Sequence, residues 1–213
     1  MSTTFEVYTT TKDIPSFDDV LNHSNKFLLN TLSKHNIDDR YVIDVKIIKE
    51  ETHEVVPFDK SSPATWAIDG EYAWFTINEH SGGCDAYVYD FGEYLHFEHW
   101  YDCFIDGKQA KVSKEKMRDC FESGFYWSFR RSSGQPAIIN LSYGLIAAAF
   151  TELTNGLIYS DDCAWDYAVF PTSADRFLQS YFDPKYAEPK YANWAEQCIN
   201  IIKMAGDDGN ADE

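Results

Sequence analysis

Residues 136–166 read PAIINLSYGLIAAAFTELTNGLIYSDDCAWD, and this stretch decides the fold. Apolar side chains go most of the way round the run 137–155, which predicts a helix buried on more than one side. We therefore expect nearly full burial of four of its residues, Leu141, Leu145, Ala149 and Leu153. Asn155-Gly156 is typical of a helix C-terminus, and a short strand from Leu157 then leads into an acidic loop.

Alternating and helical apolar patterns on both sides of this stretch indicate an α+β fold in a single domain, with helices packed on a mainly antiparallel central sheet. We expect the domain to cover 1–205 and residues 206–213 to form a disordered acidic tail. The middle third leaves no room for the crossover helices of a parallel sheet. Strands are predicted near 5–9, 41–48, 64–69, 72–79, 85–90, 94–101, 125–131 and 157–160, and helices near 16–35, 113–123, 137–155, 173–182 and 191–204.

Local signals support several of these boundaries. Ser16 with Asp19 three residues later forms a capping box at the start of the first helix. Asp69-Gly70 and Phe91-Gly92 each predict a hairpin turn. Aromatic residues occupy both alternation phases of the strands in the middle third. This sheet is therefore either covered on both faces or meets a partner with its second face.

The charge is strongly acidic, with 35 Asp and Glu against 18 Lys and Arg and a net charge of −17. A field of this sign disfavours nucleic acid and anionic membranes and favours a cationic partner, although acidity also serves solubility alone. The five cysteines are scattered without a C-x-x-C pair, which predicts free thiols and no zinc site. Without a secretory signal or an apolar run of membrane-spanning length, we expect a cytoplasmic protein.

Candidate chemistry is sparse. His96, Glu98 and His99 offer metal-ligand types, but on a strand they would not all share a face. Cys84 follows two glycines without an oxyanion-hole signature. Asp161, Asp162 and Asp166 lack the calcium-loop pattern, so surface or partner contact is favoured over catalysis. Nucleotide and hydrolase motifs are absent from the sequence, and we expect no catalytic residue, no metal and no cofactor.

The run Thr151–Asp166 resembles a segment of bacterial immunity-type proteins, those of polymorphic, contact-dependent or type VI secretion toxin systems, in which an ALAxLTGGxIYxDD pattern recurs. In this run Asn155 stands where that pattern commonly has glycine. The resemblance implies a protein that neutralises a cognate toxin by binding it.

Taken with the acidic field and the surplus of Trp and Tyr, this resemblance favours a cytoplasmic immunity protein whose partner is a toxin with a basic surface. We predict partner contacts at Asp161, Asp162, Trp165 and Asp166, with Trp165 as the aromatic anchor; the competing interpretation places Trp165 in the core. The alternatives are an enzyme with an unrecognised site at the Asp161/Asp162 loop or Cys84, or a regulatory binding subunit. The sequence leaves the oligomeric state open.

Overall fold

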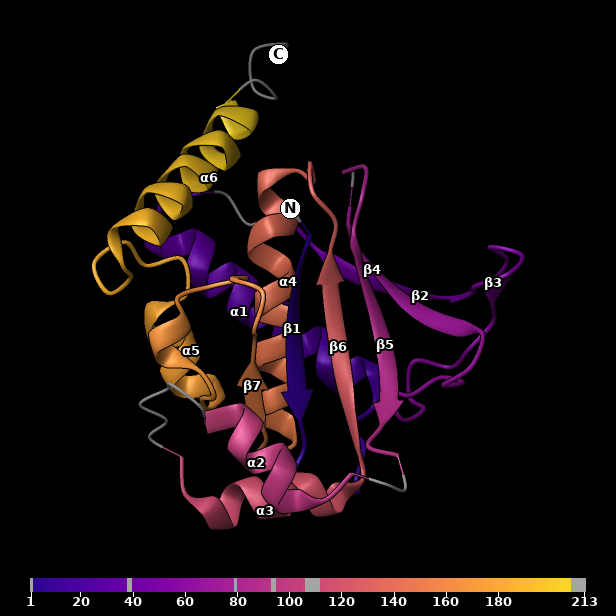
Figure 1. The fold of residues 1–213 in the computed structure, drawn as a ribbon. Helices are drawn as coiled ribbons and strands as arrows, with labels where there is room; N and C mark the ends of the chain where they lie inside the picture. Colours follow the sequence, from indigo (N-terminus) through magenta and orange to yellow (C-terminus); the bar gives the residue numbers. More distant parts are fainter. Residues whose placement is uncertain (1, 38–39, 79, 93–94, 106–111, 208–213) are drawn as a thin grey trace.

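The computed structural model describes residues 2–37, 40–78, 80–92, 95–105 and 112–207 (Figure 1). Within these ranges the strands are β1 (Thr3–Tyr8), β2 (Ile43–Lys49), β3 (Val55–Val56), β4 (Glu71–Ile77), β5 (Cys84–Asp90), β6 (Phe125–Arg131) and β7 (Leu157–Tyr159). The helices are α1 (Phe17–Lys34), α2 (Phe97–Ile105), α3 (Lys114–Ser123), α4 (Ala137–Leu153), α5 (Ala174–Ser180) and α6 (Pro189–Asp207), and a 3₁₀ turn spans Tyr167–Val169.

The seven strands form one sheet in the order β3-β2-β4-β5-β6-β1-β7, and each neighbouring pair is antiparallel. This confirms the predicted α+β fold with an antiparallel sheet. β1 and β2 flank the first helix in sequence, yet β4, β5 and β6 lie between them in the sheet. The opening strand–helix–strand segment therefore spans the sheet from one side to the other.

Helix α4 is the centre of the core. Every residue from Ala137 to Thr151 is buried, because α4 contacts β1, β4 and β6 of the sheet and also α1, α5 and α6. The predicted burial of Leu141, Leu145 and Ala149 is confirmed, whereas Leu153, in the last turn, is only partly buried.

The end of α4 is a Schellman motif. Gly156 N–H donates to the Thr151 carbonyl (2.8 Å) and Asn155 N–H to that of Glu152 (3.1 Å), with Asn155 at a φ of 47°. A Cβ on Gly156 would lie 2.3 Å from the Tyr8 carbonyl oxygen. Glycine here lets the chain turn closely against β1 before it enters β7.

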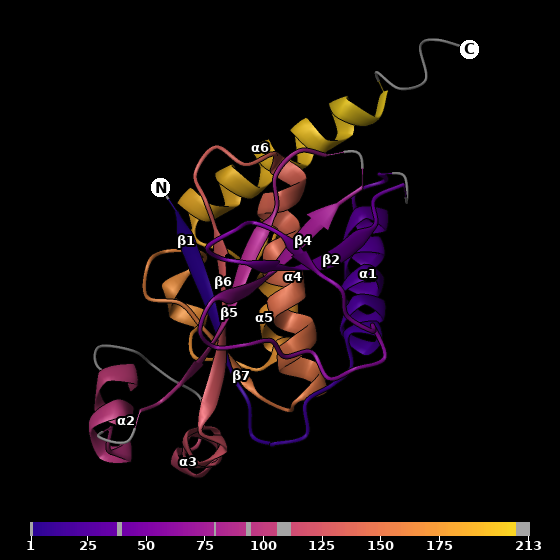
Figure 2. The same cartoon turned by 90° about the vertical axis from the view of Figure 1, so that its right-hand side faces the viewer.

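Strict alternation divides the sheet into two faces. Ala73 and Phe75 of β4 and Ala86 and Val88 of β5 are buried toward α4, while their sequence neighbours point to the other face. Figure 2 shows α1 and α4 on one side of the sheet; on the other side α2 lies near one end only. Much of the second face is therefore not covered by a described helix.

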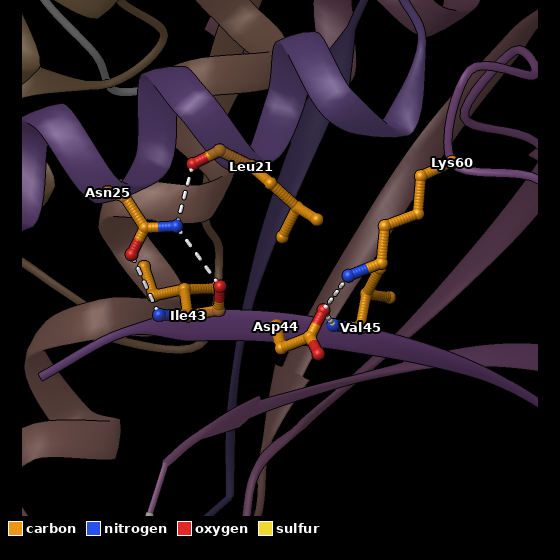
Figure 3. A network of polar contacts seen from close by, with 6 residues as sticks. All are labelled: Leu21, Asn25, Ile43, Asp44, Val45 and Lys60. Carbon is orange, nitrogen blue, oxygen red and sulfur yellow. Dashed lines mark hydrogen bonds and ion pairs between the residues drawn. The ribbon is translucent and has the colours of Figure 1, made fainter.

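Helix α1 is fixed at both its start and its middle. The predicted capping box is confirmed, since the Ser16 side chain accepts from the Asp19 N–H and the Asp19 carboxylate accepts from the Ser16 N–H. Farther along, the Asn25 amide donates to the Ile43 carbonyl (3.0 Å) and accepts from the Ile43 N–H (2.8 Å), which ties α1 to the first residue of β2 (Figure 3). Asn25 thus satisfies backbone groups at a sheet corner.

The strand predicted at 64–69 is wrong. Ala64 N–H donates to the Pro15 carbonyl and Trp66 packs near Phe17, so this segment crosses the start of α1 instead of pairing in the sheet. The turn at Asp69-Gly70 exists, with Gly70 at a φ of 87°, but the antiparallel neighbours of β4 are β2 and β5. The short strand β3, which pairs with β2, was not predicted.

The strand predicted at 94–101 is also wrong, because the described part of this segment enters helix α2; residue 94 lies outside the described residues. The aromatic residues Phe97, Trp100, Tyr101 and Phe104 follow helical spacing. Trp100 and Phe104 pack on Tyr8, with ring centroids 5.4 and 4.9 Å away, so α2 covers the β1–β7 end of the second face.

Helix α6 differs from its prediction at both ends. It begins at Pro189 and runs to Asp207, two residues into the predicted tail; residues 208–213 lie outside the described residues. On this helix Ile199 is buried and Ile201 is exposed. Among the described helices, none combines the length and apolarity that a membrane crossing demands.

Candidate functional site

The acidic loop after β7 is a compact turn. The Ser160 hydroxyl donates to the Asp162 carboxylate (3.1 Å) and accepts from the Ala164 N–H (3.3 Å), while Cys163 has a φ of 65°. Asp161 is exposed and Asp162 half-buried. These two carboxylates are the predicted contact residues that the structure places at the surface.

Asp166, in contrast, is 5% exposed. One carboxylate oxygen accepts from the Ala168 N–H (3.0 Å) and the other from the Glu188 N–H (3.3 Å). The side chain therefore joins the loop to the backbone just before α6. These bonds give Asp166 a structural role. Its side chain lies inside the fold, whereas a contact residue is expected at the surface.

Trp165 is completely buried. Its ring stacks on Phe182 with centroids 5.6 Å apart and meets Tyr181 edge-on at 5.0 Å. Trp165 is therefore a core residue, as the competing interpretation has it, and not an exposed aromatic anchor. Burial separates the four predicted contacts into two surface acids and two interior side chains.

The groups considered for catalysis lie in unfavourable surroundings. Cys84 is 1% exposed, and burial followed by the neighbouring Asp85 raises the pKa of its thiol well above the ordinary value. A nucleophilic cysteine needs the opposite shift. Glu98 forms an ion pair with Lys114 at 2.6 Å on the exposed side of α2. Within the described residues, no three His, Cys, Asp or Glu side chains gather as a metal site would require.

The uncovered part of the sheet carries a row of aromatic side chains, which we call the tyrosine face. Tyr87 and Tyr72 stack with centroids 5.7 Å apart, Tyr87 and Tyr89 with 6.1 Å, and Tyr89 lies 5.5 Å from Tyr126. All are at least partly exposed, and Tyr89 reaches 41%. The face consists of Tyr72 and Trp74 of β4, Tyr87 and Tyr89 of β5, and Tyr126 of β6.

The register explains why these rings meet. Tyr89 is directly opposite Tyr126, and Trp74 is opposite Asp85, so the open-face positions of three strands lie side by side. Such cross-strand neighbours are close enough for aromatic rings to stack. The signal in the sequence was the presence of aromatic residues on both alternation phases, which predicted either a covered second face or one that meets a partner.

The charged groups that act on Tyr87 and Tyr126 are mainly negative, whereas Lys46 lies opposite Trp74 in another part of the tyrosine face. Burial, and then the Asp85 and Glu50 carboxylates, raise the pKa of Tyr87 to about 12. Burial and then Glu6 raise the pKa of Tyr126 to about 12. Arg130 is a cation in this area, but it pairs with Asp85 at 3.1 Å. The hydroxyls of these two tyrosines thus lie in a negative potential.

Comparison of the chain with models of known protein families, with curated proteins and with solved structures found no match. The resemblance of Thr151–Asp166 to immunity-type proteins therefore stays a hypothesis.

Proposed function

We propose that this protein binds and neutralises a basic protein partner, as a cytoplasmic immunity protein does with its toxin, and that it uses the tyrosine face for contact. The observation that carries the proposal is that this row of stacked, partly exposed aromatic rings lies on the part of the sheet face that no described helix covers. Tyrosine and tryptophan are the side chains that most often dominate binding energy at protein interfaces.

The chemistry of the face favours Arg and Lys side chains. A cation placed over a tyrosine ring gains a cation–π interaction, and the Glu6 and Glu50 carboxylates add attraction. The net charge of −17 would further accelerate the approach of a basic partner. The same charge opposes pairing of two copies of this chain, which would bring like-charged molecules together.

Asp161 and Asp162 keep their proposed role as contacts that steer association. Exposed charges act mainly on the association rate, so Asp161→Asn with Asp162→Asn is expected to slow association and leave dissociation unchanged. Neither an enzyme nor a regulatory subunit gains a specific supporting observation, and the Cys84 thiol considered for catalysis is buried.

Co-expression with the product of the gene adjacent to that of this protein tests the proposal. We expect a complex that survives purification, is lost with the double substitution Tyr87→Ala and Tyr89→Ala, and persists with Tyr186→Ala. Tyr186 is 59% exposed and lies outside the tyrosine face, so it is a matched control. If no complex forms with the neighbour's product, the immunity role is refuted. If the complex forms equally well with the double substitution, the tyrosine face is not the contact surface.

A further inference from the structure

A pocket lies beside the acidic loop, where the end of β6 meets the start of α6. Its volume is about 270 Å³, the size of a site for a small molecule. Three separate segments build it, and its lining residues are Arg131, Cys163, Ala164, Lys190, Tyr191 and Trp194. Two cationic side chains in one pocket contrast with the excess of acids in the chain as a whole.

Arg131 has a charge that its hydrogen bonds leave uncompensated. Its guanidinium donates to the Thr3 hydroxyl (2.9 Å) and to the Asn140 amide oxygen (3.0 Å), both of which are neutral. In the part of the chain that the structure describes, Arg131 forms no ion pair and its Nε has no acceptor. The preceding residue, Arg130, shows the usual arrangement, an ion pair with Asp85 at 3.1 Å.

A second donor and an aromatic wall complete the pocket. Tyr191 is 7% exposed, and within the described residues its hydroxyl has no partner besides the adjacent Cys163 thiol. Burial and then the adjacent Cys163 raise the pKa of Tyr191, which keeps this hydroxyl protonated as a donor. Lys190 is exposed at the rim, and the Arg131 guanidinium lies 5.9 Å from the centre of the Trp194 ring.

We propose that this pocket binds a small organic anion, with its carboxylate or phosphate oxygens at Arg131, Lys190 and Tyr191 and its apolar part against Trp194. A guanidinium with neutral partners and a buried hydroxyl beside a thiol, which is only a weak acceptor, are the groups that such an oxyanion satisfies. The pocket uses residues outside the tyrosine face, so this proposal does not depend on the protein-binding function.

The pocket contains its own reporter. Cys163 lines it and is exposed, whereas Cys103, also exposed, lies on α2 away from the pocket. Alkylation by the neutral reagent iodoacetamide is followed at each cysteine by mass spectrometry, with benzoate or inorganic phosphate added and chloride as the control at equal ionic strength. We expect a several-fold slowing at Cys163 and no change at Cys103.

Substitutions then identify the groups that hold the anion. Lys190→Gln and Arg131→Gln should each weaken the protection about tenfold, because each removes hydrogen bonds to a charged group. Lys185→Gln, an exposed lysine outside the pocket, should leave it unchanged. Asp162→Asn should strengthen the protection, since the charge of Asp162 also acts on Tyr143, which lies under Arg131.

Protection by benzoate identifies a carboxylate ligand, and protection by phosphate alone identifies a phosphorylated one. Arg131 also contacts Thr3 and Asn140, so its variant is first checked for an unchanged melting temperature; exposed Lys190 gives the same test without that concern. The proposal is overturned if neither anion protects Cys163, or if protection is the same in the Lys190→Gln protein.

Discussion

At the scale of single residues, the absence of a side chain at Gly144 leaves room for the Tyr181 ring against α4. A Cβ at this position of α4 would lie 2.3 Å from the Tyr181 ring, whose hydroxyl donates to the Asn140 carbonyl at 2.9 Å. Tyr181 in turn meets Trp165 edge-on. The glycine therefore lets α5 and the acidic loop approach the central helix.

Gly144→Ala should destabilise the protein by about 1–3 kcal/mol, because overpacking of a buried ring outweighs the gain of about 1 kcal/mol in helix propensity. The free energy of unfolding in denaturant measures this effect. In a Tyr181→Ala background the same substitution should be neutral or stabilising, since the ring is gone and the propensity remains. Equal losses in both backgrounds would show that the ring contact is not the cause.

Predictions for single residues agreed with the structure where the interaction is local in the sequence. The capping pair Ser16 and Asp19 is local, so four residues of sequence are sufficient to predict it. Trp165 follows two surface acids, and nothing in its neighbourhood indicates burial; the rings that cover it include Phe182 and Trp194, well downstream in the chain. Burial of a loop residue depends on such distant segments.

At the scale of elements, the spacing of apolar residues was sufficient to predict a helix or strand where the pattern was strong. The continuous apolar run predicted α4, and alternation predicted β2, β4, β5 and β6. In the segment that forms α2, Phe97, Trp100 and Phe104 follow the helical period, but a short stretch of alternating aromatics was interpreted as a strand. The segment 64–69 has strand-like composition, and its backbone bonds to the start of α1 are long-range contacts that no local pattern encodes.

The central position of helix α4 predicts a large loss of stability when one of its buried side chains is shortened. Leu145→Ala should lower the free energy of unfolding by roughly 2–5 kcal/mol, because Leu145 is 1% exposed and its removal leaves a cavity among packed elements. Leu29→Ala on α1 is the control, since Leu29 is 44% exposed and loses little burial. Similar effects of the two substitutions on denaturant midpoints would contradict the central position of α4.

At the scale of the whole molecule, the two proposed binding surfaces differ in how far the sequence predicts them. The tyrosine face arises from three strands with aromatic alternate positions, so its existence followed from pattern, although its partner did not. The pocket combines Arg131, Cys163 and Lys190, which come together only because β6, the acidic loop and α6 converge. Such a site has no continuous sequence signature.

The large number of tyrosines gives the whole molecule a predicted response to alkali. Burial raises the pKa of Tyr143 from 10.0 to about 12, with the Arg131 guanidinium opposing that shift. Burial raises the pKa of Tyr181 and of Tyr8 in the same direction. The folded protein therefore retains protons on these hydroxyls at a pH where the unfolded chain has released them.

The direction of the effect follows from proton linkage. Between pH about 10 and about 12 the unfolded state binds fewer protons than the folded state, so stability is retained below pH 10 and falls as the pH rises through this interval. For Tyr143, which is fully buried, the rise in pKa from 10.0 to about 12 corresponds to roughly 2–3 kcal/mol of stability lost by pH 12. Denaturant unfolding at successive pH values should show this decline.

Tyr143→Phe, which removes one of the titrating groups, should make the decline shallower, whereas Tyr186→Phe, at a 59% exposed position, should leave its slope unchanged. A decline of equal slope in all three proteins would show that buried tyrosine ionisation does not drive alkaline unfolding.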